Sequence, residues 1–597
     1  MQTVNDRIAL LRTNMRDLNL DAYLIPTSDP HQSEYVADHW KARVWLSGFT
    51  GSSGILVVTR DHAGLWTDSR YFLQAEEELR PSEVVLHKQT VPYAPEHIPW
   101  LIDQLPEGST VGCDGYLFSH DELRGIEKEL GQKNIGLHYR VDIVAQIWAN
   151  RPPLPQKEVF EHDTRFAGKS REEKLSVVRK KMNPTGANSY LVSTLDDIAW
   201  ILNIRSSDIA YNPVCISYLV IEKDRTCWFV DASKIPSALE QKMEKQGIYL
   251  KAYDAVEDYL KALPSGTKLL VDSSTLNARL FEAIPAGVPV QGSNIVCNLK
   301  AIKNETEIGH IRNAMKKDGV ALLRFYRWLE ATLAAGDTVG EAAAAKKLAG
   351  FRSLQEGYFG ESFGAIVGYK ANGAIIHYSP EEDKCAQIGQ QGMLLLDSGG
   401  QYLDGTTDIT RTTVMGEASE EQKINYTLVL KGHIALANTK FPAGTTGVQL
   451  DTLARMFLWQ AGLNYGHGTG HGVGFFLNVH EPPQGITPNP KTSRGQNPIQ
   501  PGMLTSNEPG FYKTGEYGIR IENLVVCIEA EENEYGKFLG FETVTLFPID
   551  TTLIKIELLD QQEKKWLNHY HQKVFKSISP ELDDQERAWL EKKCKAI

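Results

Sequence analysis

The chain has 597 residues, which is too long for one hydrophobic core and predicts about three or four domains of ordinary size. Its 42% hydrophobic and 23% charged residues are typical of a soluble globular protein, and a formal net charge of -12 argues against a nucleic-acid partner, which would require a basic face. The seven cysteines include no CxxC pair and fit a reducing compartment with reduced, packed thiols.

The first residues predict an amphipathic helix rather than a targeting segment. Ile8, Leu11 and Met15 are apolar, and charged residues stand between them. No charged segment leads into an apolar core of about 7–15 residues, and no apolar stretch approaches the length of a membrane span. We therefore expect a cytoplasmic protein with no membrane partner.

Residues 1–155 are predicted to form an α/β domain. Strand signals at 22–25, 54–59, 64–68 and 110–114 alternate with helical signals at 97–105 and 120–130. The glycine-rich SGFTGSSG at 47–54 lacks the Gly-Lys-Ser/Thr ending of a phosphate-binding loop, which favours a tight turn.

Residues 156–302 are predicted to repeat this domain. The sequence at 190–194 echoes 23–27, 228–231 echoes 66–68, and 263–272 echoes 105–114. The offsets drift gradually, as they would if loops had gained and lost residues between two copies of one fold. The proline-rich stretch 151–155 is the expected linker.

Residues 303–548 are predicted to form an α+β domain. A long amphipathic helix at 305–336 precedes two expected hairpins, at 363–378 and 393–414, and helices near 419–440 and 447–461. Strands and helices are grouped without strict βαβ alternation, which favours α+β. Residues 549–597 are charged and helix-like with an apolar stripe through Trp566 and Tyr570, and we expect this extension to pack on the third domain or on another subunit.

Asp397 and Asp408 stand eleven residues apart across a glycine-containing hairpin signal. An apolar run ends at Asp397, and a run rich in β-branched residues follows Asp408, so both carboxylates are expected at the ends of neighbouring strands. A carboxylate at the rim of an apolar strand is unfavourable unless a positive group meets it. Taken alone, the pair could equally be turn-capping aspartates.

The run GHGTGHGVG at 466–474 places His467 and His471 four residues apart, and His480 follows. The spacing resembles the helical zinc motif HExxH, but glycines at this density oppose a helix. The two histidines therefore need not point the same way. A packed structural role is the alternative for each.

Two glutamates follow. Glu508 lies in SNEPGFY, where it could be only a turn residue. In GIRIEN the alternation of apolar and polar residues predicts a strand with Arg520 and Glu522 on one face, and a surface ion pair is the alternative for them.

Together these positions supply four carboxylates and one or more imidazoles. Four carboxylates neutralise two divalent cations, and oxygen ligands suit manganese or cobalt better than they suit a thiolate zinc site. Two cations roughly 3.5–4 Å apart can ionise a bridging water and polarise a carbonyl. The set therefore predicts a two-metal hydrolytic centre.

The motifs DSGGQYLDGTTDITRT, GHGTGHGVG, SNEPGFY and GIRIEN resemble, in that order, the metal-ligand motifs of the pita-bread metallopeptidases. The resemblance is closest to the Xaa-Pro aminopeptidases of the long three-domain form. It covers nearly the whole chain, including WLSGFTGSSG and WTDSRYF in the first domain and LDDIAWILNIRSSDIAYNP in the second. It implies two creatinase-like α/β domains ahead of a pita-bread α+β catalytic domain.

The resemblance also implies residue roles, and no ligand position departs from the family pattern. Asp408 and Glu522 would bridge the two metals, and the full ligand set would be Asp397, Asp408, His471, Glu508 and Glu522. Three histidines would surround the substrate: His377 at the end of the expected first hairpin, His467 and His480. Arg520 and Tyr512 would support the ligands.

We hypothesise hydrolysis of the bond between an N-terminal residue and a following proline. A metal-bridging hydroxide would attack the carbonyl, one metal and His480 or His377 would stabilise the oxyanion, and Glu508 would shuttle the proton. Proline specificity rests on the resemblance, aided by the missing N–H of proline, which peptidases that rely on that hydrogen cannot use. The expected partners are Xaa-Pro peptides and two divalent ions, Mn²⁺ foremost, with Co²⁺ or Zn²⁺ as alternatives.

Three other functions compete with this one. A prolidase, which cuts only dipeptides, would share all five ligands, although the additional repeated domain favours longer peptides. A non-enzymatic peptide-binding relative would be expected to have lost ligands. GESFG at 360–364 matches the serine-hydrolase GxSxG pattern, but the strand-like residues that follow it argue against that elbow.

Two further expectations concern surfaces. The proline-rich segment 482–501 could be a lid beside His480, but a surface excursion is favoured. The resemblance implies a homodimer.

Overall fold

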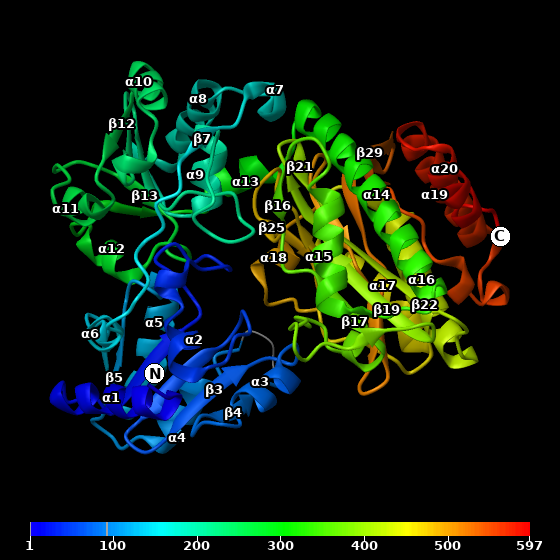
Figure 1. The fold of residues 1–597 in the computed structure, drawn as a ribbon. Coiled ribbons are helices and arrows are strands. Elements are labelled where there is room, and N and C mark those ends of the chain that lie inside the picture. The colour runs from blue at the N-terminus through cyan, green and yellow to red at the C-terminus, as the bar shows by residue number, and fades with distance from the viewer. Residues whose placement is uncertain (1, 91–93) are drawn as a thin grey trace. The chain divides into compact units, whose positions relative to one another are not determined.

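This computed structural model describes residues 2–90 and 94–597, which fall into two compact units (Figure 1). One unit comprises the chain up to Glu161 together with Lys169–Val296, and the other comprises His162–Gly168 and Cys297–Ile597. Within the described residues, no helix is both long and apolar enough to cross a membrane.

The first unit contains two six-stranded sheets of the same topology, in the orders β4-β3-β2-β1-β5-β6 and β12-β11-β10-β8-β13-β14. Each central strand, β1 or β8, pairs antiparallel with one neighbour and parallel with the other. The predicted internal repeat is therefore confirmed. The strands of the first sheet are β1 (Ala22–Pro26), β2 (Ile55–Thr59), β3 (Ala63–Thr67), β4 (Val85–Lys88), β5 (Thr110–Cys113) and β6 (Gly136–His138). Those of the second are β8 (Ser189–Val192), β10 (Tyr218–Glu222), β11 (Thr226–Phe229), β12 (Ile248–Lys251), β13 (Leu269–Val271) and β14 (Pro289–Gln291).

Local sequence explains the helices of this unit. The first helix, α1 (Val4–Asp17), begins at a capping box formed by Thr3 and Asp6, and it buries the apolar stripe predicted for it. The helices α4 (His97–Gln104) and α5 (His120–Leu130) also lie where they were expected. The SGFTGSSG stretch is a turn: α2 (Ala42–Ser47) ends at Gly48 with φ 76°, and the buried Arg43 donates to the carbonyl of Phe49.

The second unit is built around α14 (Glu305–Ala334), whose N-terminus is closed by a capping box between Asn304 and Glu307. The apolar face of α14 packs in one core with β19 (Gly392–Ser398) and β22 (Ile409–Met415), which pair antiparallel. A six-stranded sheet, β23-β30-β29-β26-β24-β25, forms the other half of this unit. Its strands are β23 (Phe441–Pro442), β24 (Gly470–Gly472), β25 (Glu481–Ile486), β26 (Leu504–Asn507), β29 (Asn523–Asn533) and β30 (Gly536–Thr543). The helices α16 (Glu420–Ala437) and α17 (Gly447–Gln460) pack on this sheet, whereas α15 (Glu341–Arg352) packs on α14.

The C-terminal extension packs within the second unit. Its helices α19 (Gln561–Ile578) and α20 (Asp584–Lys593) lie beside α14 (Figure 1). Leu567, Tyr570 and Val574 of α19 belong to the same core as α14. Of the two predicted alternatives, packing on the third domain is the one observed.

Two local predictions were wrong. The stretch 363–378 is no hairpin, because β17 (Ile366–Tyr369) runs into the 3-10 helix η6 (Lys370–Ala374) and pairs with β19 instead. The segment 482–501 is not wholly a surface excursion, because its first residues belong to β25, which pairs with β24. Only its later part, including the short helix α18 (Ser493–Gln496), is mostly exposed.

Candidate metal centre

The two aspartates lie at neighbouring strand ends, as predicted. Asp397 is near the end of β19 and faces Thr410 of β22 across the pair, while Asp408 immediately precedes β22. Both residues are buried. The connection between them is more than a simple hairpin turn, because it contains the short strands β20 (Gly400–Tyr402) and β21 (Gly405–Thr406).

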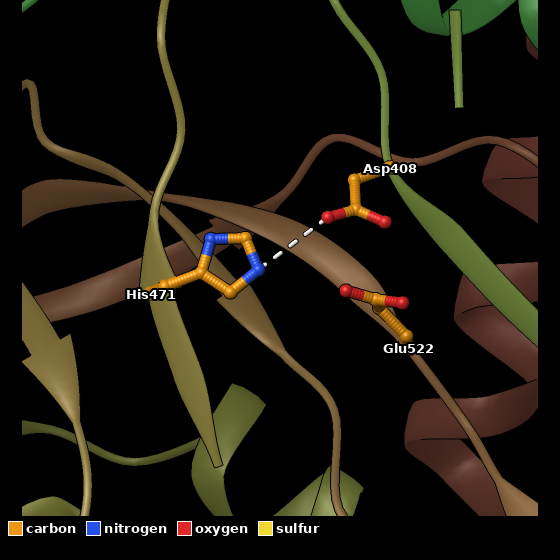
Figure 2. Close-up of side chains that lie close together, drawn as sticks. All are labelled: Asp408, His471 and Glu522. Carbon is orange, nitrogen blue, oxygen red and sulfur yellow. Dashed lines mark ion pairs between the residues drawn. The ribbon is translucent and has the colours of Figure 1, made fainter. Parts of the chain in front are cut away.

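Three side chains from distant parts of the sequence converge beside Asp397. Figure 2 shows Asp408, His471 and Glu522 pointing toward one another, and each offers one ligand atom within 4.8 Å of the others. His471 lies on β24. Glu522 lies between β28 (Tyr517–Arg520) and β29 rather than on a continuous strand, a small correction to the predicted GIRIEN strand.

The His471 ring presents a lone pair to two carboxylates. Its Nδ1 lies 3.0 Å from the carbonyl oxygen of Gly472 and therefore carries the hydrogen, which leaves Nε2 as an acceptor. Nε2 lies 3.5 Å from both Asp408 Oδ2 and Glu508 Oε1. Burial lowers the pKa of His471 to about 4, so the ring is neutral near pH 7. Lone pairs that face one another in this way repel unless a proton or a metal cation lies between them.

Asp397 has a protein cation on one side only. Arg520 Nη2 donates to Asp397 Oδ2 at 2.5 Å, and Nη1 donates to the Tyr512 hydroxyl at 2.6 Å. The same hydroxyl lies 2.8 Å from His467 Nε2, which completes a chain of four predicted site residues. The other oxygen, Asp397 Oδ1, is buried and has no hydrogen-bond partner among the described residues.

The four carboxylates carry more negative charge than the chain neutralises. Burial raises the pKa of Asp408 to about 6 and that of Glu508 to about 7, and burial also raises the pKa of Asp397 and Glu522. Arg520 pairs with Asp397, and Arg520 and Arg352 also lower the pKa of Asp408, but two guanidinium groups do not balance four carboxylates. Oxygen donors, one neutral imidazole and the unpartnered Asp397 Oδ1 fit divalent cations such as Mn²⁺ or Co²⁺.

The remaining predicted histidines border this cluster to different extents. The His480 ring meets His471 edge to face, with centroids 4.3 Å apart. His377 is half-buried and follows η6, which packs against β19 and β28, the strands that carry Asp397 and Arg520. Because β17 is not followed by a second strand, His377 stands in a loop rather than at a hairpin end.

Four family models match the chain in series. The description "Creatinase/Prolidase N-terminal domain" fits residues 7–143 and again 150–307, "Metallopeptidase family M24" fits 309–529, and "C-terminal region of peptidase_M24" fits 537–597. Aminopeptidase P2 of Arabidopsis thaliana is 40% identical over 98% of this chain and 88% of its own length. The chain belongs to the Xaa-Pro aminopeptidases of metallopeptidase family M24. Xaa-Pro aminopeptidase 1 of Dictyostelium discoideum is 38% identical over 100% of this chain and 97% of its own length.

Solved structures separate this family from the dipeptidases. An X-prolyl aminopeptidase from Caenorhabditis elegans, described as a cytosolic enzyme with a di-nuclear active site, matches with TM-score 0.95 and 35% identity over 100% of both chains. An Xaa-Pro dipeptidase from Bacillus anthracis matches with TM-score 0.50 and 25% identity, and covers 64% of this chain. The full-length likeness favours the aminopeptidase over the prolidase alternative.

The serine-hydrolase alternative fails on geometry. Ser362, the serine of GESFG, is fully buried and donates its hydroxyl to the carbonyl of Thr407 at 2.9 Å. A strand, β17, follows it where the nucleophile elbow requires a helix. Ser362 therefore braces the loop between the two aspartates of this Xaa-Pro aminopeptidase.

Sequence reasoning missed Thr410, which connects two ligand motifs. Its hydroxyl donates to Glu522 Oε2 at 2.7 Å and accepts from Arg520 Nε at 3.1 Å. The signal was present, because strand alternation places residues 408, 410 and 412 on one face. The Thr410 hydroxyl therefore lies on the same face as Asp408, which indicated a contact with the other ligands.

A buried ion pair that the sequence reading also missed holds the histidine loop. Arg455 and Asp451, one turn apart on α17, pair at 2.6 Å with both side chains 1% exposed. Arg455 also donates to the carbonyls of Tyr465 and His467, at 2.7 and 2.6 Å, and Asp451 accepts from the Thr469 hydroxyl. An acid–arginine pair at i and i+4 on the apolar face of a helix was the signal.

Proposed function

We propose that this enzyme removes the N-terminal residue from peptides with proline in second position, with two divalent cations bound by five side chains. The side chains that would hold the cations are Asp397, Asp408, His471, Glu508 and Glu522. The observation that carries this proposal is the cluster of ligand atoms: a neutral imidazole nitrogen 3.5 Å from two buried carboxylate oxygens.

When bound, such a pair of cations ionises water near neutral pH and polarises a carbonyl oxygen. A side chain of the protein accepts and donates the proton. Glu508 has 18% of its side chain exposed, compared with 5% for Asp408 and 11% for Asp397, so it can exchange a proton with solvent and substrate. It is proposed to accept the proton and pass it to the leaving imide nitrogen.

The neighbouring rings are proposed to receive the substrate. His480, packed against His471, and His377 would donate to the scissile carbonyl, while His467 and Tyr512 would contact the substrate beside Asp397. A proline ring lacks the N–H that many peptidases bind, and these ring faces do not require it. The free α-amine would bind beside Asp397, which explains action at N-termini alone.

The proposal also covers the metal, the oligomeric state, the location and the domain boundaries. We propose Mn²⁺ as the resident metal, a homodimer and a cytoplasmic location, the last supported by the description of the C. elegans relative as cytosolic. We also propose four parts, 1–155, 156–302, 303–548 and 549–597, which the matches at 7–143, 150–307, 309–529 and 537–597 support.

The test uses metal-stripped protein restored with Mn²⁺, Co²⁺ or Zn²⁺. Each form receives an Xaa-Pro-Xaa tripeptide, an Xaa-Pro dipeptide and an Xaa-Ala-Xaa control, and released amino acid is measured. We expect cleavage of the tripeptide, faster with Mn²⁺ than with the other ions, and no cleavage of the alanine control. Cleavage of the dipeptide alone would reveal a prolidase, and full activity after chelation would contradict a metal centre.

A further inference from the structure

Behind the cluster, one buried histidine holds the residues next to two of the glutamates. His433 of α16 is fully buried, and its Nδ1 donates to the carbonyl of Asn507 at 3.1 Å while its Nε2 accepts from Asn523 Nδ2 at 3.1 Å. Asn507 also donates back to the carbonyl of His433 at 2.9 Å. Asn507 precedes Glu508 and Asn523 follows Glu522, so His433 contacts the backbone beside one glutamate and the side chain beside the other.

A buried arginine extends this network to the backbone of Glu522 itself. Arg411 is 1% exposed, and its Nη1 donates to the carbonyls of Glu522 and Thr410 at 2.6 and 3.0 Å. Its Nη2 donates to Asn523 Oδ1 at 2.8 Å. All these acceptors are neutral, so the orientation of the guanidinium depends on the hydrogen bonds that it makes.

The C-terminal extension closes this network. The Tyr570 hydroxyl of α19 accepts from Arg411 Nη2 at 2.9 Å and lies 2.9 Å from the carbonyl oxygen of Phe547, to which it donates. One turn earlier on α19, Trp566 meets the His433 ring edge to face at 5.9 Å. The same helix therefore contacts both the arginine and the histidine of the network.

We propose that Tyr570 is a positioning residue of the metal centre, acting through Arg411 and Asn523 to set the placement of Glu522 relative to Glu508. The C-terminal extension is then part of the centre rather than an appendage. This inference rests on the proposed function, because it assigns Glu508 and Glu522 to metal. Arg411 Nη2 also donates to the Phe547 carbonyl at 2.6 Å, so the Tyr570 hydroxyl is one of three acceptors around it, and the same hydroxyl lies 3.2 Å from Asn523 Oδ1. Removing the hydroxyl takes away both contacts, and we expect Arg411 and Asn523 to shift and the adjoining Glu522 to move with them.

The test is Tyr570→Phe in the full chain, which deletes one oxygen and keeps the ring. Tyr326→Phe is the matched control: Tyr326 of α14 is equally buried at 3% exposed, stacks on Phe547, and its hydroxyl has no hydrogen-bond partner in the described part of the chain. Each manganese-loaded protein is dialysed against graded chelator and its metal content counted. The visible spectrum of each Co²⁺-substituted form reports the ligand geometry.

We expect Tyr570→Phe to release metal at a roughly tenfold lower chelator concentration than wild type, with an altered Co²⁺ spectrum, as for residues behind metal ligands. Tyr326→Phe should match wild type in both. Unchanged retention and spectrum in Tyr570→Phe would overturn the inference, as would equal changes in both variants. If wild type itself retained no metal, the proposed function would fail as well, so the two failures are distinguishable.

Discussion

Buried carboxylates occur in two kinds of place in the catalytic unit. Asp318 and Asp451 each pair with a buried arginine, Arg352 at 2.8 Å and Arg455 at 2.6 Å. In the candidate metal centre, Arg520 pairs with Asp397, and burial raises the pKa of all four carboxylates. At the structural sites the chain supplies an arginine to balance each buried carboxylate. At the candidate metal centre we expect bound cations to supply that charge instead.

The strongest way to break this comparison is to remove a carboxylate from the metal centre. We expect Glu522→Gln to lower kcat/KM by at least roughly 10³-fold, the scale of losing an electrostatic group that acts in the transition state, and to reduce bound metal. Asp404→Asn is the control: Asp404 is 1% exposed but pairs with Lys317 at 3.1 Å, and this variant should keep its metal. Activity and metal content are measured together. Equal metal loss in both variants would mean that carboxylates of the metal centre do not differ from paired structural carboxylates.

The next largest effect concerns a structural pair. Arg455→Met leaves Asp451 buried without a cation and removes the donors to the Tyr465 and His467 carbonyls. We expect a loss of about 3–5 kcal/mol in unfolding free energy, measured by urea unfolding of the metal-loaded protein. Lys440→Met, which breaks a pair exposed by 62% and 46%, should cost under about 1 kcal/mol. Similar losses of unfolding free energy in the two variants would contradict a structural role for the Arg455–Asp451 pair.

The metal-free protein should lose stability as pH rises. Asp408 and Glu508 have folded pKa values of about 6 and about 7, above the ordinary values near 4 of an unfolded chain. Their stabilising contribution is therefore complete below pH ~4 and disappears as pH rises through about 7. For Asp408 alone the loss is roughly 3 kcal/mol. Unfolding curves at pH 5 and pH 8 should differ for metal-free protein and much less for metal-loaded protein, and a metal-free protein that is more stable at pH 8 would contradict this reasoning.

A substitution sharpens the same point. Because burial outweighs the nearby positive groups and raises the pKa of Asp408 to about 6, Asp408→Asn should stabilise the metal-free protein at pH 8 by roughly 2 kcal/mol while destroying metal binding. Asp451→Asn, at a residue that pairs with Arg455, should destabilise it. Opposite signs in urea unfolding are the expected result. The same sign in both would mean that the two kinds of site do not differ.

The difference between the two kinds of site could be read only partly from the sequence. The repeat, the long α14 and the strand ends at Asp397 and Asp408 followed from local periodicity and turn residues, because each depends on short-range patterns. The η6 turn after β17 and the pairing of β25 with β24 depend on tertiary contacts that override local strand signals. Sequence also could not show that Arg520 would face Asp397, or that Tyr570 would reach Arg411, since these contacts join residues far apart in the chain.

The smallest expected effect tests where the metal centre ends. His467 lies one hydrogen bond beyond Tyr512, which Arg520 connects to Asp397, so it should influence the substrate and not the metal. We expect His467→Gln to lower kcat/KM by roughly tenfold with unchanged metal content, the usual scale for a residue behind the ligands. His569→Gln, at an exposed position on α19, is the control for a surface histidine. If His467→Gln instead lost metal as Glu522→Gln does, His467 would be a ligand, and the two histidines of GHGTGH would share one role instead of dividing substrate and metal between them.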